Sequence, residues 1–296
     1  MAEYQRNKNI ITSNIREFER RAAVAQEQKR ISVQMLTSLI WDNVAEEGTD
    51  AVWRELGEVL GSTSLEDKGN ICIAICDSLG EDGLARINLF DSARAVSPMA
   101  SGRVAYVHNK RSDDAFLAFG KKVFNPKADY VSGFSDACEA VMDGRSEFCI
   151  LPLENNTEGR LYSFYALLDR YDLKICHKTD ISNEDGTDTV GFALVGRAVG
   201  EGFDRDERVR FEFSVVDEDT DFISRVLGVA EALGGKVYSI GTQPVLYDEG
   251  SCRCYFSVDM RAHMATAMAL YMSIEHSGYA PLGLYKIQKG EEKWKR

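Results

Sequence analysis

The spacing of apolar residues predicts that the first third of the chain is helical. Between Ile11 and Leu39 apolar positions recur at alternating intervals of four and three residues, interrupted at Lys29 and Ser32, which favours one long helix or two. The residues that carry this pattern are Ile11, Ile15, Phe18, Ala22, Ala25, Leu36 and Leu39. Further amphipathic helices are expected over residues 50–60, 64–80 and 82–96, with glycines at 48 and 80 as stops. Residues 1–97 are therefore predicted to be a helical region.

Short apolar runs alternate with helical spacing in the second region, residues 102–197. Strands are expected over residues 104–107, 130–134, 149–153, 173–177 and 190–196, with Pro152 stopping the third strand. Helices are expected over residues 112–123, over 135–142, and after the third strand. This alternation predicts a parallel α/β sheet that binds ligands at the carboxyl ends of its strands.

The third region, residues 208–288, has the order βαββαβ. Strands are expected over 208–216, 236–246, 252–259 and 282–287, and helices over 222–233 and 263–275. The first of these strands alternates, with Val209, Phe211, Phe213 and Val215 facing inward. The order is ferredoxin-like, so the whole chain belongs to the mixed α/β and α+β classes.

A polar hinge follows the third predicted strand. Asn155 and Glu158 have the spacing of a capping box, and Gly159 in the first helical turn permits a close approach to the backbone. Free N–H groups at a helix start favour a carboxylate or phosphate, so this hinge, Thr157 included, is a candidate anion site. The alternative is an ordinary strand-to-helix turn without a ligand.

The hinge also carries a family resemblance. The residues PLENNTEG, followed by LYSFYALLD, resemble the Pro-x-Glu-Asn-x-x-x-Gly segment of prephenate dehydratases, which implies that Glu154 and Asn155 lie in a substrate cleft as catalytic candidates. The likeness to the family's first lobe extends over residues 102–181, through RVAYVHNKRSDDAF and FSDACEAVMDGRSEF. Where the family has a glycine-rich turn, this chain keeps the helix-capping Ser112 and adds Lys110 and Arg111, which are candidate ligand-binding cations.

Two parts of the family's catalytic site are missing. Only residues 181–190 join the fourth and fifth strands, so the segment that builds the second lobe is absent. Val190, Gly191 and Phe192 replace the family's Thr-Arg-Phe strand, which removes the acid and the carboxylate clamp. Thr189 is one position away, and a shift of one residue turns a strand side chain to the other face.

The third region resembles the ACT regulatory domain that follows the dehydratase in this family. Its ligand motifs are altered: Asp221, Phe222 and Ile223 replace Gly-Ala-Leu, and Gly241, Thr242, Gln243 and Pro244 replace Glu-Ser-Arg-Pro. Asp221 adds bulk and negative charge where an amino-acid carboxylate would lie, which argues against phenylalanine binding in the family's usual mode. These seven residues are the candidate regulatory site.

The helical first region has two interpretations. Residues Arg21–Ala25 and Lys29 are faintly similar to the first helix of the chorismate mutase bundle that precedes the dehydratase in some relatives. Basic residues at such intervals are also common on solvated helices, so a dimerising or packing region is favoured over a mutase.

Composition and net charge restrict the classes of partner and cofactor that the protein is expected to bind. The net charge of −12 argues against nucleic acid, and no apolar run approaches the ~20 residues of a membrane span. Seven scattered cysteines predict no disulfide framework and fit a reducing cytoplasm. The four histidines stand far apart and Cys252-x-Cys254 lacks a second ligand pair, so we expect no metal and no cofactor.

Two hypotheses about function follow. The favoured one is a non-catalytic ligand-binding or regulatory protein of aromatic amino acid metabolism, with a small carboxylate or aromatic amino acid as ligand. The alternative is an active divergent dehydratase that converts prephenate to phenylpyruvate, with Lys110 or Arg111 replacing the lost clamp. The helical stripe and the open edges of a ferredoxin-like sheet predict a homodimer in either case.

Overall fold

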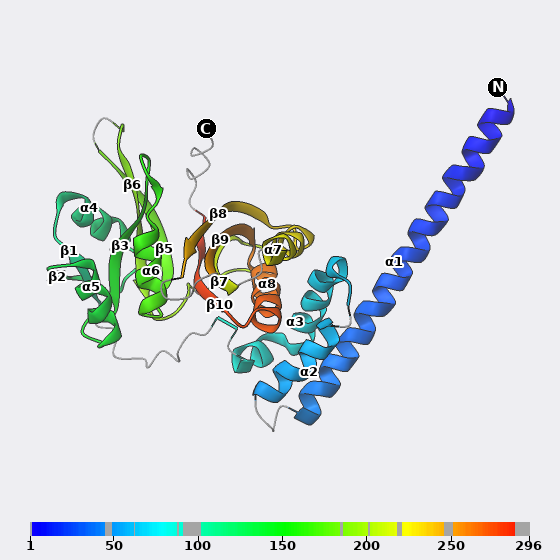
Figure 1. Cartoon of the computed structure of the whole chain (residues 1–296), viewed down its shortest axis with the longest axis horizontal. Helices are drawn as coiled ribbons and strands as arrows, with labels where there is room; N and C mark the ends of the chain where they lie inside the picture. Colours follow the sequence, from blue (N-terminus) through cyan, green and yellow to red (C-terminus); the bar gives the residue numbers. More distant parts are fainter. Residues whose placement is uncertain are drawn as a thin grey trace. The chain divides into compact units, whose positions relative to one another are not determined.

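The computed structural model describes residues 2–44, 49–61, 63–87, 89–90, 102–183, 186–200, 202–217, 221–245 and 251–287 (Figure 1). The chain divides into two compact units, Met1–Ile87 and Asn88–Arg296. The predicted boundary at residues 97–101 and residues 247–250, between two predicted strands of the third region, lie outside the described residues. The further division of the second unit near residue 200 stays a prediction.

The first unit is helical, as predicted. It consists of α1 (Ala2–Val44), α2 (Thr49–Gly61) and α3 (Leu65–Ile87), so the long apolar stripe belongs to one helix rather than two. Gly80 has the non-helical angles φ 62° and ψ −173°, and the predicted stop there is a kink within α3. No helix among the described residues has the length and hydropathy of a membrane span.

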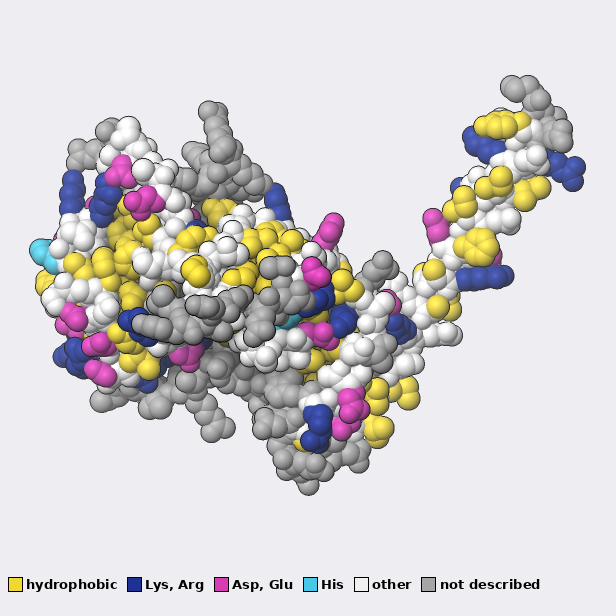
Figure 2. Space-filling model, viewed as in Figure 1, with side chains coloured by type: hydrophobic (Ala, Val, Ile, Leu, Met, Phe, Trp, Pro, Cys, Tyr) yellow, Lys and Arg dark blue, Asp and Glu magenta, His cyan; other side chains and the backbone are white. Residues whose placement is uncertain are grey.

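The apolar residues of α1 have two different environments. In the second half of the helix, Val33 and Ile40 are each 7% exposed and contribute to the core of this unit. In the first half the same face carries Ile11 and Phe18, which are 59% and 68% exposed. Figure 2 shows apolar side chains along this exposed part of α1. The predicted stripe residues Leu36 and Leu39, in the second half, are 42% and 59% exposed, so Val33 and Ile40 rather than the stripe itself are buried there.

The second unit is built on one mixed sheet. Its strands are β1 (Arg103–Val107), β2 (Lys127–Val131), β3 (Phe148–Asn155), β4 (Gly159–Arg160), β5 (Lys174–Ser182), β6 (Thr189–Gly196), β7 (Arg208–Asp217), β8 (Lys236–Pro244), β9 (Cys252–Arg261) and β10 (Tyr279–Lys286). Its helices are α4 (Lys110–Phe119), α5 (Phe134–Met142), α6 (Tyr162–Arg170), α7 (Asp221–Ala232) and α8 (Ala262–Glu275). The strand order is β2-β1-β3-β6-β5-β10-β7-β9-β8, with β4 paired to β3.

The prediction of a parallel sheet is correct only for β1, β2 and β3. β6 runs antiparallel to both β3 and β5. The reason is the short connection after β5: the Asn183 N–H bonds the Asp188 carbonyl at 2.9 Å, which closes a hairpin, and a hairpin joins antiparallel strands.

The sheet continues without a break into the βαββαβ region, whose predicted element order is confirmed. Here β10, β7, β9 and β8 are all antiparallel neighbours. The junction is narrow, because β5 and β10 share the single pair Ile175 and Gly283. A Cβ atom at Gly283 would lie 2.6 Å from the Ile175 Cβ, so only glycine permits this approach.

Helices cover both faces of the sheet. The α4 residues Ala115 and Phe119 pack with β1, β3 and β6 on one face, and α5 and α6 cover the other. The α6 residue Tyr165 packs with β3 and also with Tyr255 and Tyr285 of the βαββαβ region. α6 therefore lies against both halves of the sheet, and it buries the face of β7 that a two-layer domain would expose.

Two sequence predictions around the hinge are wrong. Pro152 does not stop β3, which continues to Asn155, because the proline lies beside a bulge in the pairing of β3 with β6. The helix does not begin at the hinge either. Asn155 and Gly159 form a pair between β3 and β4, and α6 begins only at Tyr162.

Candidate functional site

The motif residue Glu154 lies between two buried cations. An oxygen of its carboxylate accepts a hydrogen bond from the Lys178 ammonium on β5 and lies 3.9 Å from Nε of Arg160 on β4. The side chains of Lys178 and Arg160 are 2% and 7% exposed, and that of Glu154 is 16% exposed. This carboxylate is thus engaged by the chain's own basic residues.

Gly191 makes room for the lysine. It lies opposite Glu154 on one side and Asp180 on the other. A Cβ atom at Gly191 would lie 3.2 Å from Cε of Lys178 and 3.2 Å from an oxygen of Asp180. Glycine thus occupies the position at which the family has an arginine. The cation at this place comes instead from Lys178 of the neighbouring strand β5.

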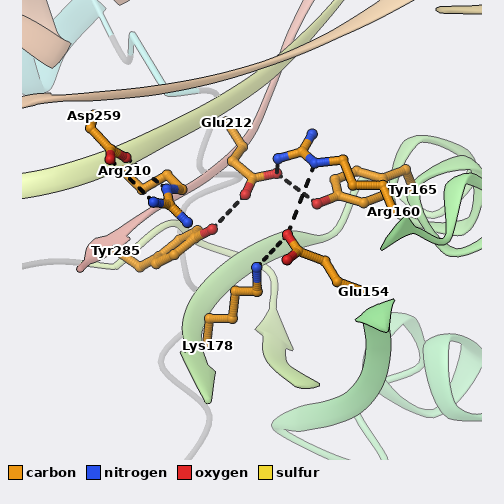
Figure 3. A network of polar contacts seen from close by, with 8 residues as sticks. All are labelled: Glu154, Arg160, Tyr165, Lys178, Arg210, Glu212, Asp259 and Tyr285. Carbon is orange, nitrogen blue, oxygen red and sulfur yellow. Dashed lines mark hydrogen bonds and ion pairs between the residues drawn. The ribbon is translucent and has the colours of Figure 1, made fainter. Parts of the chain in front are cut away.

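A second buried carboxylate, Glu212 on β7, continues the network (Figure 3). One of its oxygens lies 3.3 Å from Nη2 of Arg160 and accepts a hydrogen bond of 2.9 Å from the Tyr165 hydroxyl. Its other oxygen accepts a hydrogen bond from the Tyr285 hydroxyl. Arg160 therefore lies between Glu154 on the hinge side and Glu212 on the βαββαβ side, and it links the two halves of the sheet.

The charges of this network follow from their surroundings. Burial favours a neutral Glu212, but Arg160, then Lys178 and the Tyr285 hydrogen bond, outweigh burial and lower the pKa of Glu212. Burial raises the pKa of the Tyr165 hydroxyl, and the Glu212 charge adds to that rise. The network at neutral pH therefore holds an ionised carboxylate and a neutral phenol.

Further polar groups line the same face of the sheet. The Arg210 guanidinium binds Asp259 through hydrogen bonds of 2.7 Å and 3.1 Å and lies 3.6 Å from the centre of the Tyr238 ring. The Asp169 carboxylate on α6 accepts hydrogen bonds of 3.0 Å from the hydroxyls of Ser214 and Tyr255. Burial raises the pKa of Asp169, although Arg253 opposes this shift.

The hinge residues themselves form a tight turn. The Asn155 side-chain oxygen accepts hydrogen bonds from the backbone N–H groups of Thr157, at 3.0 Å, and of Glu158, at 2.5 Å. Gly159 has φ +74°, a conformation that glycine adopts at low cost. These bonds explain the Asn–Glu spacing without a helix start, so the helix terminus predicted at Asn155 is wrong, whereas a ligand role for these residues stays a prediction.

The predicted cations lie at the neighbouring strand end. Asn109, rather than Ser112, caps α4: its side-chain oxygen accepts a 3.0 Å hydrogen bond from the Ser112 N–H. Ser112 is buried, and its hydroxyl accepts a 2.8 Å hydrogen bond from the Asn109 amide. Arg111 pairs with Asp188 just before β6, and Lys110 begins α4. The structure thus places Arg111 near the start of β6, engaged with a carboxylate.

The predicted regulatory residues have mixed environments. Asp221 begins α7, but Phe222 is fully buried and meets the Phe256 ring edge-on at 6.2 Å, so it is a core residue. Ile223 is half-buried. Gly241 faces α6, where a Cβ atom would lie 1.6 Å from the Tyr162 hydroxyl. Tyr162 therefore occupies the space beside this part of the predicted motif.

The remaining three residues of that motif lie at the end of β8. Thr242 and Pro244 are exposed and Gln243 is half-buried. No cluster of three or more potential metal ligands occurs among the described residues.

Sequence reasoning missed most of the network. Arg160, Lys178, Glu212 and Tyr285 were not singled out from the sequence, and Tyr165 was included only as part of the motif LYSFYALLD. The alternation of β7 gave one weak signal: Arg210, Glu212 and Ser214 all lie between the predicted inward positions.

Comparison with known proteins identifies the fold. No family model and no curated protein matches the chain. Among solved structures, the chain is similar to GqqA, described as a novel type of quorum-quenching acylase, with a TM-score of 0.52, 18% identity and coverage of 65% of this chain and 99% of that one. It is similar to prephenate dehydratase from Streptococcus mutans, with a TM-score of 0.51, 16% identity and coverage of 63% and 99%.

A third similar structure is prephenate dehydratase from Arthrobacter aurescens in complex with L-Phe. Its TM-score is 0.50, its identity 12%, and the match covers 62% of this chain and 90% of that one. At these identities the likeness establishes a fold like that of prephenate dehydratase, and a fold can support unrelated chemistries.

Proposed function

We propose that this chain is a prephenate dehydratase-related protein of phenylalanine and aromatic amino acid metabolism that binds a small carboxylate or an aromatic amino acid and has lost dehydratase activity. The observation that carries the proposal is the engagement of the motif by the chain itself. Lys178 and Arg160 hold the Glu154 carboxylate, and the Asn155 side chain closes its own turn.

The loss of activity follows from what the reaction needs. Dehydration of prephenate requires a proton for the leaving hydroxyl and cations for two carboxylates. Thr189 does not replace the missing acid, because its hydroxyl lies 2.7 Å from that of Ser182 at an exposed hairpin. Arg111 does not stand free as a clamp, because it pairs with Asp188.

One observation favours the alternative, an active divergent dehydratase. Gly191 leaves room for the Lys178 side chain, so a cation does reach the place of the absent arginine. In that alternative Lys178 would exchange Glu154 for a substrate carboxylate. The two functions therefore differ in whether this lysine meets a substrate or only Glu154.

Two measurements on the same purified protein separate these functions. Phenylpyruvate formation from prephenate is followed by absorbance, and binding of prephenate, phenylpyruvate, phenylalanine and tyrosine is followed by titration calorimetry. We expect binding of at least one compound without phenylpyruvate formation. Saturable turnover that disappears in Glu154→Ala would establish the alternative, and binding of none of these compounds would contradict the proposal.

We further propose that the protein is a cytoplasmic homodimer that binds no nucleic acid. None of the described cysteines forms a disulfide bond, which fits a reducing compartment. The exposed first half of the α1 stripe is the main candidate contact, so residues 1–97 act as a dimerising region rather than as a mutase. The outer edge of β8, the last strand of the sheet, is a second candidate contact.

A further inference from the structure

The first half of α1 carries apolar side chains at a seven-residue repeat. From Tyr4 to Ala25 the repeat positions follow alternating intervals of four and three residues, with Lys8 among them. Such a repeat is typical of a helix that packs along a second helix. At 1.5 Å per residue this stretch is about 32 Å long. Figure 2 shows this part of α1, and its bulky apolar side chains are each more than half exposed, namely Tyr4, Ile11, Ile15 and Phe18.

A partly open cavity of about 250 Å³ lies between α1 and α3, where the exposed stretch ends. It is lined on α1 by residues between 23 and 30 and on α3 by residues between 67 and 73. An apolar cavity of about 150 Å³ is large enough for benzene, so this cavity has room for an aromatic ring. Its wall combines apolar and polar side chains, among them Ala23, Ile71, Ile73, Gln26 and Asn70.

The charged groups of the cavity wall form pairs. Lys29 lies 2.7 Å from Asp67, and Arg30 lies 2.6 Å from Glu27. Each of these cations therefore has an acidic partner within the wall. Since complementary charge determines which partners a surface accepts, a neutral group with a polar tip matches this wall better than an anion or a cation.

A second copy of α1 could cover the exposed stretch in either of two directions. In a parallel pair equal-numbered residues meet, so Lys8 would face the partner's Lys8, and both cavities would stay unfilled. In an antiparallel pair the two exposed stretches also cover each other, but the Tyr4 end of one lies beside the Ala25 end of the other. The antiparallel direction thus separates the like charges and brings each helix start to a cavity.

The seven-residue repeat sets the register of the antiparallel pair. With Ile15 beside the partner's Phe18, Ile11 lies beside Ala22 and Lys8 beside Ala25. The next repeat position, Tyr4, then lies beside the partner's Lys29, which belongs to the cavity wall. A two-fold axis gives both copies the same contact, so each protomer offers one tyrosine and accepts another.

We propose that two copies of the chain pair through antiparallel α1 helices and that Tyr4 of each copy inserts into the α1–α3 cavity of the other. The ring packs against Ala23 and Ile71, and its hydroxyl reaches the polar side chains of Gln26 and Asn70. This inference rests on the proposed homodimer, to which it adds the direction of the helices, the anchoring side chain and the cavity that accepts it.

The first test changes the anchor and the cavity separately in the full chain. Sedimentation measures the dissociation constant of the dimer. We expect Tyr4→Ser to weaken the dimer at least tenfold, and Tyr4→Phe, which keeps the ring, to weaken it much less. Ala23→Leu fills the cavity with a good helix former, so it should also weaken the dimer at least tenfold without loss of helix content. Ala118→Leu, at an exposed position of α4, is the matched control and should leave the dimer unchanged.

The second test determines the direction of the helices by disulfide formation. Within one chain Tyr4 lies about 38 Å along α1 from Lys29, which pairs with Asp67 of α3, so cysteines at positions 4 and 70 can join only two different copies. On oxidation we expect a disulfide-linked dimer from the double variant Tyr4→Cys, Asn70→Cys. We expect none from either single variant or from the wild type.

The outcomes separate this inference from the proposals on which it rests. A linked dimer from Tyr4→Cys alone would show parallel helices and overturn the inference while leaving the homodimer intact. Unchanged dimer affinity in Tyr4→Ser and Ala23→Leu would exclude the cavity as the acceptor. A monomeric wild type would contradict both the inference and the homodimer, but neither the proposed ligand binding nor the proposed loss of activity.

Discussion

The first half of α1 and the face of the sheet beneath α6 depart from the usual distribution of residues in opposite ways. On α1, Ile11 and Phe18 expose more than half of their surface, whereas beneath α6 Glu212 is fully buried and Arg210 is 2% exposed. Exposed apolar patches and buried charges are the informative exceptions in a folded protein. The exposed part of the α1 stripe is the candidate for contact with another surface, whereas the buried charges form ion pairs within the chain.

The comparison therefore predicts different responses to mutation. A change beneath α6 should alter the stability of each protomer, independently of concentration. A change in the α1 stripe should alter association and leave the fold of the protomer intact. The predictions below use this difference, and each has a control of matched chemistry.

The largest effect is expected for Arg160→Met. This change leaves Glu212 buried without its guanidinium partner, and loss of one member of a buried ion pair costs about 3–5 kcal/mol. The free energy of unfolding, measured by urea denaturation, should fall by this amount. Arg111→Met removes the exposed pair with Asp188 and should cost about 0–1 kcal/mol. Equal losses in the two variants would contradict the importance of the buried network.

The next effect concerns association through α1. A phenylalanine buried in an interface contributes about 1.5–3 kcal/mol, so Phe18→Glu should weaken the dimer at least tenfold. Sedimentation at micromolar concentration measures the change. Ser13→Glu adds the same charge on the opposite side of the helix and should leave the dimer intact. A wild-type mass that stays near a single chain of 33.0 kDa on concentration would refute the dimer.

A smaller effect is expected where α6 meets β8. A methyl group at Gly241 collides with the Tyr162 ring and hydroxyl, so Gly241→Ala should cost about 1–3 kcal/mol of unfolding free energy. In a Tyr162→Ala background the same change should cost much less, and a double-mutant cycle measures the difference. Gly133→Ala is the control, since its new methyl group would lie 3.7 Å from the nearest atom, in ordinary contact. An equal cost of Gly241→Ala with and without the Tyr162 side chain would show that Tyr162 does not contact residue 241.

The smallest expected effect is a pH dependence from His177. Burial, with added repulsion from Lys122 and Lys286, lowers the pKa of this imidazole below its usual 6.5. The unfolded state then binds more protons than the folded state, so this histidine makes the protein less stable as the pH falls below 6.5. His177→Gln should flatten the curve of unfolding free energy against pH between 5 and 7. His108→Gln, at a side chain that is 63% exposed, is the control, and equal flattening by both would contradict the assignment.

The sequence was sufficient for features that depend on local periodicity. The helical first region, the βαββαβ order and the inward set Val209, Phe211, Phe213 and Val215 could all be predicted, because each pattern is contained in one segment. The start of α6 could not be predicted from its capping pattern. Asn155 and Glu158 satisfy each other equally well in a turn between two strands.

The buried network was beyond prediction for a different reason. Arg210 and Glu212 alternate with apolar residues just as they would on a solvated strand face. Glu212 is buried by residues far from it in the chain, Tyr165 of α6 and Arg160 of β4 among them, and Arg210 by Asp259 of β9 and Tyr238 of β8. The residue pattern of β7 contains no information about residues elsewhere in the chain that cover it. The burial of Lys178 and Tyr285 could not be predicted for the same reason.

The single-residue junction between β5 and β10 bears on biosynthesis. β10 is the last strand along the chain, and β5 lies in the interior of the sheet, so one edge of β5 has no strand partner until Tyr279–Lys286 has left the ribosome. An open strand edge is a site for pairing with other chains, and the first part of a protein usually folds while the rest is still being made. The nascent chain therefore passes through a stage at which β5 is exposed to other nascent chains that are translated from the same messenger RNA.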